Sequence, residues 1–196
     1  MQREQGFSLV ELLVSISIVL ITLTGLAKMT LENSRINRAQ QMTAQVQGNA
    51  RNCMALVVQK LRSAGWDPLN ANLQSVIWDT IPGDGIDEIE VFADLDSDGL
   101  TDSQDEQIMI RHDTDRILLR RTNDPSDPFL IVATNISNDQ NGDGTVEAMF
   151  TPIFDPNPAA DRILVQITAQ SPDPDPMTGE FIRYTVRSEV ALRKTL

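Results

Sequence analysis

Acidic side chains recur at alternate positions in residues 94–105, which read DLDSDGLTDSQD. The spacing fits a twelve-residue calcium loop, in which oxygen ligands surround one hard cation and a glycine permits the sharp turn. The predicted ligands are the side chains of Asp94, Asp96, Asp98, Asp102 and Asp105 and the backbone carbonyl group of Leu100. The last position usually holds glutamate, so the shorter Asp105 is a poorer chelator and the adjacent Glu106 is an alternative ligand. We therefore predict bound Ca²⁺, and a solvated acidic turn is the alternative.

A second candidate calcium loop, residues 139–147 (DQNGDGTVE), has fewer of the ligand positions filled. Its oxygen-bearing side chains are those of Asp139, Asn141, Asp143, Thr145 and Glu147. Phe150 stands where the last ligand would be and offers no carboxylate. Asn-Gly and Asp-Gly pairs are also ordinary turn signals, so a plain turn is the alternative here. Because strands are predicted on both sides of the first loop, we expect a loop-only calcium site there rather than an EF-hand switch.

One carboxylate, Glu11, interrupts the apolar stretch of residues 7–27, which follows the polar leader MQREQG. At about 1.5 Å per residue, a helix of this length spans a bilayer core of about 30 Å. An acidic residue within such a helix is costly and usually marks a partner or a function. Glu11 is therefore the sharpest functional candidate in this segment.

The run Gly-Phe-x-Leu-Val-Glu-Leu-Leu-Val resembles the processing site of type IV pilin-like precursors, and the resemblance covers residues 2–27. It implies that a prepilin peptidase cuts after Gly6 and methylates the new N-terminal Phe7. It also implies that Glu11 contacts the free N-terminal amine of a neighbouring subunit. A carboxylate in apolar surroundings needs a cation, and this cleavage creates one. A second run, residues 61–66 (LRSAGW), resembles the end of the long helix in PilW-like minor pilins.

A cleaved secretory signal is the alternative interpretation of the N-terminus, but such signals are cut after the apolar core. Here the best site lies before the core, so the apolar helix would stay in the mature protein. Arg3 favours a cytoplasmic N-terminus, although Lys28 weakens the charge asymmetry. We expect a single-pass protein of the bacterial inner membrane with its C-terminal domain outside the cytoplasm, and later a place in a pilus or pseudopilus filament.

The elements around these sites predict an α+β, pilin-like fold. No proline precedes Pro68, and apolar residues recur every three or four positions from Ile36 to Ala64, which predicts one amphipathic helix over residues 7–64 that ends near Gly65. Strands are predicted over residues 86–93, 107–112, 116–122, 129–135, 146–152, 162–169 and 181–193. Residues 113–115 should close a hairpin, whereas the proline-rich residues 171–179 should form a loop outside any ladder. The predicted organisation is a leader (1–6), a long helix (7–64, with 7–27 as the transmembrane segment and filament core) packed on an antiparallel sheet, and an acidic β-domain (65–196).

Composition separates the first third of the chain from the remaining two-thirds. The formal net charge is −12, and residues 66–196 hold 25 of the 28 acidic side chains. Such a domain does not suit nucleic-acid binding, which requires a basic face. The single cysteine, Cys53, excludes an intramolecular disulfide and is expected to be an apolar helix residue. His112, the only histidine, is expected on the surface beside a turn, and no nucleophile motif accompanies it, so we expect no enzyme.

These features together predict a minor pilin of a type IV pilus, a structural subunit that primes or enters the filament near its tip. Its expected partners are other pilins through the N-terminal helix, the prepilin peptidase, and the inner membrane before assembly. A J-type pseudopilin of a type II secretion system is the first alternative, because it resembles PilW-like proteins over the same elements. A membrane-anchored calcium-binding surface or adhesion domain that never polymerises is an alternative of another class, and an anchored enzyme is the most remote.

Overall fold

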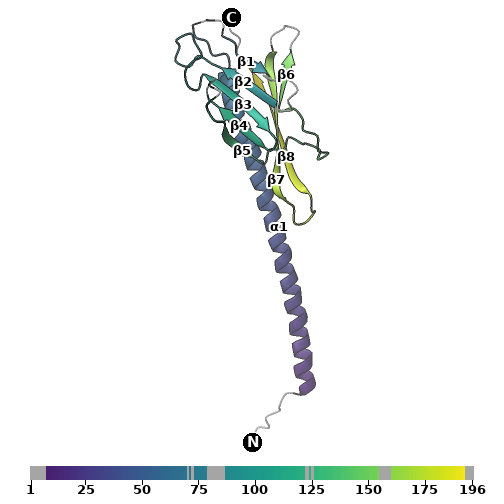
Figure 1. The fold of residues 1–196 in the computed structure, drawn as a ribbon. Coiled ribbons are helices and arrows are strands. Elements are labelled where there is room, and N and C mark those ends of the chain that lie inside the picture. Colours follow the sequence, from purple (N-terminus) through teal and green to yellow (C-terminus); the bar gives the residue numbers. More distant parts are fainter. Residues whose placement is uncertain are drawn as a thin grey trace.

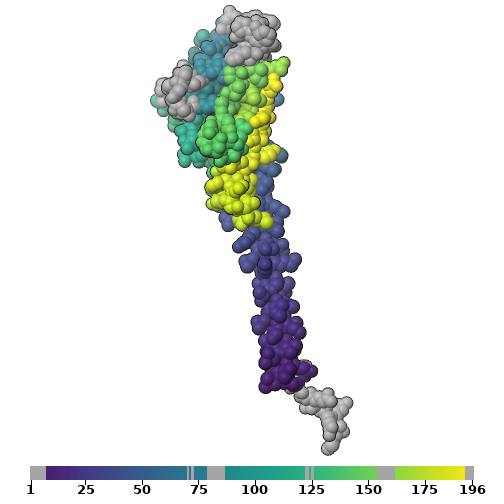
Figure 2. Space-filling model, turned by 90° about the vertical axis from the view of Figure 1, so that its right-hand side faces the viewer, coloured from purple at the N-terminus to yellow at the C-terminus, as the bar shows by residue number. Residues whose placement is uncertain are grey.

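The computed structural model describes residues 8–69, 71, 73–78, 87–121, 124, 126–154 and 160–192. Within these ranges the chain forms one long helix and eight strands. Figure 1 shows the helix as a stem that enters the β-domain with its C-terminal half and projects from it with its N-terminal half. The space-filling view in Figure 2 shows the same elongated shape. The predicted leader and Phe7 lie outside the described residues.

The helix α1 (Leu9–Ser63) contains 55 residues without a break, which gives a length of about 82 Å. Gly25 and Gly48 both lie inside it, although each weakens a helix by about 1 kcal/mol relative to alanine. Gly65, just past the end, has a φ of 70°, a left-handed conformation that glycine adopts readily after a helix. The prediction of one continuous helix ending near Gly65 is confirmed.

The apolar stripe of α1 is buried only where the β-domain covers it. Its buried residues are Met42, Val46, Ala50, Cys53, Met54, Val57 and Leu61. Farther toward the N-terminus, the large apolar side chains from Leu9 to Leu31 are more than half exposed. An 18-residue window of α1 has a mean hydropathy of 2.3 with none of it buried, which is long and apolar enough to cross a membrane. The exposed half of α1 therefore needs apolar surroundings from outside the chain.

Two antiparallel sheets pack on α1. The first has the order β1-β2-β3-β4-β5 and the second has the order β6-β7-β8. The strands of the first are β1 (Val76–Trp78), β2 (Asp87–Phe92), β3 (Gln107–Asp113), β4 (Arg116–Arg120) and β5 (Leu130–Thr134). Those of the second are β6 (Phe150–Phe154), β7 (Ala160–Pro174) and β8 (Phe181–Ala191).

The core lies between α1 and the inner faces of both sheets. Val57 and Leu61 of the helix belong to one buried cluster with Ile89 and Ile110 of the first sheet and Ile167 of the second. The side chain of Asp87 joins the sheets, because it accepts the N–H groups of Met149 and Phe150. The α+β, pilin-like architecture predicted from the sequence is confirmed, with two sheets in place of one.

Several strand boundaries differ from the prediction. The short β1 was not predicted, and β6 begins at Phe150 rather than Val146 because the preceding residues belong to a loop. The prediction of a free loop at residues 171–179 is partly wrong, because β7 continues to Pro174, which pairs with Phe181 after a register shift. The opposite edge of β7 makes its last described backbone contact at Gln170, whose N–H donates to the Asn135 carbonyl. The prolines lie beyond this contact, so the N–H groups that they lack interrupt no ladder on that edge. The predicted strand ends at residues 86, 122 and 193 lie outside the described residues.

The hairpin predicted at residues 113–115 is confirmed. Strands β3 and β4 pair through Asp113 and Arg116, and Thr114 in the turn has a φ of 58°. The expectation of a surface histidine is wrong, because His112 on β3 is only 3% exposed. Its Nε2 atom lies 2.9 Å from the carbonyl oxygen of Ile136, which supplies a polar partner inside the core.

Candidate functional site

The connection between β2 and β3 gathers three acidic side chains of the first candidate calcium loop. One carboxylate oxygen from each of Asp94, Asp96 and Glu106 lies within 4.8 Å of the others. Asp94 and Glu106 are buried, with 0% and 1% of their surface exposed, whereas Asp96 faces solvent. Three carboxylates at this spacing form a group of the kind that binds a hard cation.

Glu106 closes this loop from inside. Its Oε1 accepts the N–H groups of Leu95 at 2.7 Å and Asp96 at 3.1 Å, and its Oε2 accepts the N–H of Ser103 at 3.0 Å. Asp94 accepts the N–H groups of Asp98 and Gly99, both at 3.1 Å. The backbone of the loop therefore wraps around the two buried carboxylates.

Among the described residues, the group of mutually close carboxylates does not include the other predicted ligands. Asp105 points toward two cations, with its Oδ1 3.9 Å from Lys60 and 3.5 Å from Arg121. Asp98 accepts the N–H of Leu100 at 2.8 Å, and Asp102 is exposed. Glu106, which the sequence offered as the alternative to Asp105, thus occupies the closing position in this structure.

The first loop is attached to the C-terminal end of α1. The N–H of Asp94 donates to the carbonyl of Trp66 at 2.8 Å, and the N–H of Gly65 donates to the carbonyl of Phe92 at 2.8 Å. Lys60 adds its ion pair with Asp105 from the last turn of the helix. A change in the loop would therefore reach the end of the helix directly.

The second loop, between β5 and β6, has a similar backbone but a different electrostatic partner. Asp139 accepts the N–H groups of Gly142 at 2.6 Å and Gly144 at 3.2 Å, and Glu147 accepts the N–H of Gln140 at 3.0 Å. Hydrogen bonds from the Thr145 N–H and hydroxyl lower the pKa of the exposed Asp143. Asn141 also donates to Asp143, at 3.0 Å.

Arg183 is the partner that sequence reasoning missed. Its Nη2 lies 3.8 Å from Oδ2 of Asp139. The two residues are far apart in the chain, so no local motif joins them. Only the alternation of side chains along β8 places Arg183 under this loop.

At the N-terminus of α1, Glu11 forms a capping box with Ser8. The Glu11 carboxylate accepts the backbone N–H of Ser8 at 3.2 Å, and the Ser8 hydroxyl accepts the N–H of Val10 at 3.3 Å. Glu11 is exposed in the first turn, where the helix dipole favours a negative charge. Gly6 and Phe7, the predicted processing site, lie outside the described residues.

Two further residues that carry reactive atoms are held in structural roles. Burial raises the pKa of the Cys53 thiol to about 12, so the thiol stays protonated well above neutral pH. The Nε2 atom of the buried His112 ring lies against the backbone carbonyl of Ile136.

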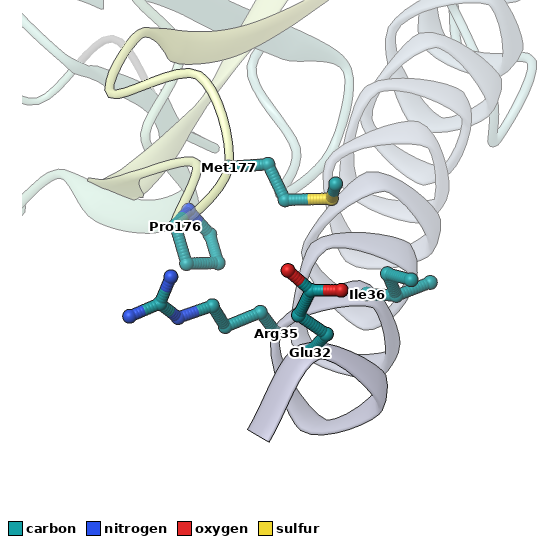
Figure 3. A pocket seen from close by; sticks show the side chains of 5 residues that line it. All are labelled: Glu32, Arg35, Ile36, Pro176 and Met177. Atoms are coloured by element: carbon teal, nitrogen blue, oxygen red, sulfur yellow. The ribbon is translucent and has the colours of Figure 1, made fainter. Parts of the chain in front are cut away.

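A pocket separates α1 from the tip of the β7–β8 hairpin, and Figure 3 shows the side chains that line it. Glu32, Arg35 and Ile36 come from the helix, and Pro176 and Met177 come from the hairpin, with Met177 reaching toward the helix. Nearby, Arg38 of the helix pairs with Asp173 at 3.4 Å. The hairpin tip thus rests beside the helix, a few residues beyond the apolar segment.

Comparison with known protein families gives one match. Residues 1–27 match the model described as the prokaryotic N-terminal methylation motif. No curated protein and no solved structure matches the chain. The motif, on a long helix that packs its second half on antiparallel sheets, supports a type IV pilin-like protein.

Proposed function

We propose that this protein is a minor pilin, a structural subunit that primes or enters a type IV pilus near its tip. The observation that carries the proposal is the methylation motif at residues 1–27, placed at the start of a helix whose apolar half is exposed. Such a helix needs lipid before assembly and the helices of other pilins afterwards. The acidic domain suits a position outside the cytoplasm, where water and cations surround it.

Processing by a prepilin peptidase is the first step of this proposal. Cleavage after Gly6 would leave Phe7 as the N-terminal residue, with a new amine next to the first turn of α1. The amide of Ser8 survives this cleavage, so Glu11 would keep the hydrogen bond that orients its carboxylate. A carboxylate oriented in this way, in apolar surroundings, attracts the N-terminal amine of a neighbouring subunit.

Calcium in the first loop is a second part of the proposal. Asp94 and Glu106 are buried, and no ion pair among the described residues joins them to a lysine or arginine. Buried carboxylates that share a site favour a cation, and Ca²⁺ prefers oxygen ligands. Asp94, Asp96 and Glu106 would hold the ion, which would fix the loop and the end of α1 that it contacts.

The experiment that tests the proposal is the intact mass and N-terminal sequence of the protein from its native membranes. We expect a chain that begins at methylated Phe7. A chain that begins at Met1, or after Ala27, would contradict processing by a prepilin peptidase and favour an anchored or secreted domain.

Deletion of the gene separates the pilus from a type II secretion system. A minor pilin predicts loss or shortening of surface pili with normal protein secretion, restored by the wild-type chain. Accumulation of unsecreted enzymes in cells that keep their pili would favour the J-type pseudopilin instead.

A further inference from the structure

The two acidic loops share one backbone arrangement. In each, the first aspartate accepts two loop N–H groups, and the residue at the third position accepts the N–H of the fifth, as Asp96 does from Asp98 and Asn141 from Asp143. Each loop also has a glutamate that accepts the N–H of its second residue. Both loops therefore turn backbone N–H groups toward carboxylates, although the neutral Asn141 leaves the second loop with less negative charge.

The loops differ in their cations. In the first, the ion pairs of the described residues go to Asp105, at the side of the loop, and not to its buried carboxylates. In the second, Arg183 lies beside Asp139, and their side chains are only 27% and 12% exposed. Burial of both partners reduces the screening of this pair by solvent.

Arg183 is also fitted to the backbone of the second loop. A β-carbon placed on Gly142 would lie 2.6 Å from Nη1, 3.0 Å from Cζ and 3.3 Å from Nη2 of Arg183, so the guanidinium group covers that glycine closely. Gly142 has a φ of 81°, which independently favours glycine. Gln170 on β7 fixes the arginine from the other side by accepting the Nε–H at 3.1 Å.

We propose that Arg183 is the built-in cation of the second loop and excludes calcium from it. The guanidinium group occupies the electrostatic role that a metal ion would have beside Asp139. The two loops would then have different roles. The first responds to calcium. The second holds the segment between β5 and β6 against the second sheet at any calcium concentration. Figure 2 shows this segment, in green, on the surface beside the yellow strands β7 and β8.

The test is calcium titration by calorimetry on the full chain in detergent, comparing the wild type with R183Q, R183K and R183Q/D139N. We expect R183Q to bind one more calcium ion per chain than the wild type, and D139N in the same chain to remove that ion. R183K keeps the positive charge and should match the wild-type stoichiometry. An R183Q chain with a native circular dichroism spectrum and no additional ion would overturn the proposal.

Two further measurements keep the proposal open to refutation if R183Q folds poorly. D139N alone should leave the wild-type calcium stoichiometry unchanged, and loss of an ion in this variant would show that calcium reaches the loop beside Arg183. In EGTA, D139N and R183Q should each lower the melting temperature, and the double variant should fall no further than the worse single one. Additive losses would contradict a direct pairing. These readouts concern the second loop, so they stand even if the first loop binds no calcium.

Discussion

The carboxylate of Glu106 accepts the backbone N–H of Leu95 at 2.7 Å, which brings the end of the first acidic loop back to its beginning. Leu95 follows Asp94 directly, so this bond sets the two buried carboxylates beside each other. Asp105 lies one residue away and faces Lys60 and Arg121 instead. A one-residue difference therefore decides which acid belongs to the candidate metal site.

This arrangement predicts that E106Q abolishes calcium-dependent stabilisation of the protein. If calcium at 100 times its Kd binds only the folded chain, it adds about 2.7 kcal/mol to the free energy of unfolding, or roughly 5–10 °C in Tm. The measurement is thermal unfolding of the full chain in detergent, with calcium and with EGTA.

D105N is the matched control for this variant. It removes an acid from the same segment but leaves Asp94, Asp96 and Glu106 in place, so the calcium shift should remain. If D105N loses the shift and E106Q keeps it, the ligand set drawn from the geometry is wrong. If the wild type shows no shift, the loop is a plain acidic turn.

Local patterns explain how much of this fold the sequence could predict. The helix follows from its apolar spacing and from the glycine and proline after Ala64, and the hairpin at Thr114 follows from a polar turn between two apolar runs. These signals depend on residues that are adjacent in sequence, so they can be recognised without knowledge of the rest of the fold.

Long-range packing explains what the sequence did not predict. The three residues of β1 are too few to show a period, and they are a strand only because Val76 pairs with Val91. The extension of β7 to Pro174 depends on its one-sided pairing with β8. Arg183 joins the second loop through the register of β8, and no spacing within residues 139–147 could indicate it.

At the start of α1, E11Q should remove the negative charge of residue 11 while keeping its capping hydrogen bond with Ser8. Glutamine still offers a side-chain oxygen to the Ser8 N–H, so α1 should begin at the same place, but the negative charge is lost. We expect the E11Q chain to be cleaved at normal levels in the membrane fraction and to be strongly reduced in the fraction of sheared filaments. Immunoblotting of the membrane and filament fractions measures the two amounts. E32Q, which removes a carboxylate farther along the exposed helix, should enter filaments normally. Equal incorporation of E11Q and the wild type would favour a protein that is anchored but does not polymerise.

In the core, L61A should be strongly destabilising. Leu61 is fully buried between α1 and the sheets, and truncation of such a residue leaves a cavity that costs about 2–5 kcal/mol. L130A truncates a leucine that is 52% exposed on β5, and surface changes of this kind usually stay within about 0.5 kcal/mol. Urea unfolding of both variants in detergent measures the difference. Equal losses would mean that the C-terminal end of α1 does not form part of the core.

The buried Cys53 thiol should make the free energy of unfolding fall at alkaline pH. Burial raises the pKa of its thiol from 9.0 to about 12, so between these values the unfolded chain releases a proton that the folded chain keeps. The contribution of the neutral thiol is therefore complete below pH 9 and is lost as the pH rises toward 12, at up to about 1.4 kcal/mol per pH unit. Comparing the wild type with C53A cancels the other alkaline titrations, so the difference in unfolding free energy should shrink as the pH rises above 9.

The native chain should also resist iodoacetamide at about pH 8, where a solvent-exposed thiol is partly ionised, and react only once unfolded. Rapid alkylation of the native protein would show that Cys53 is not enclosed between α1 and the sheets.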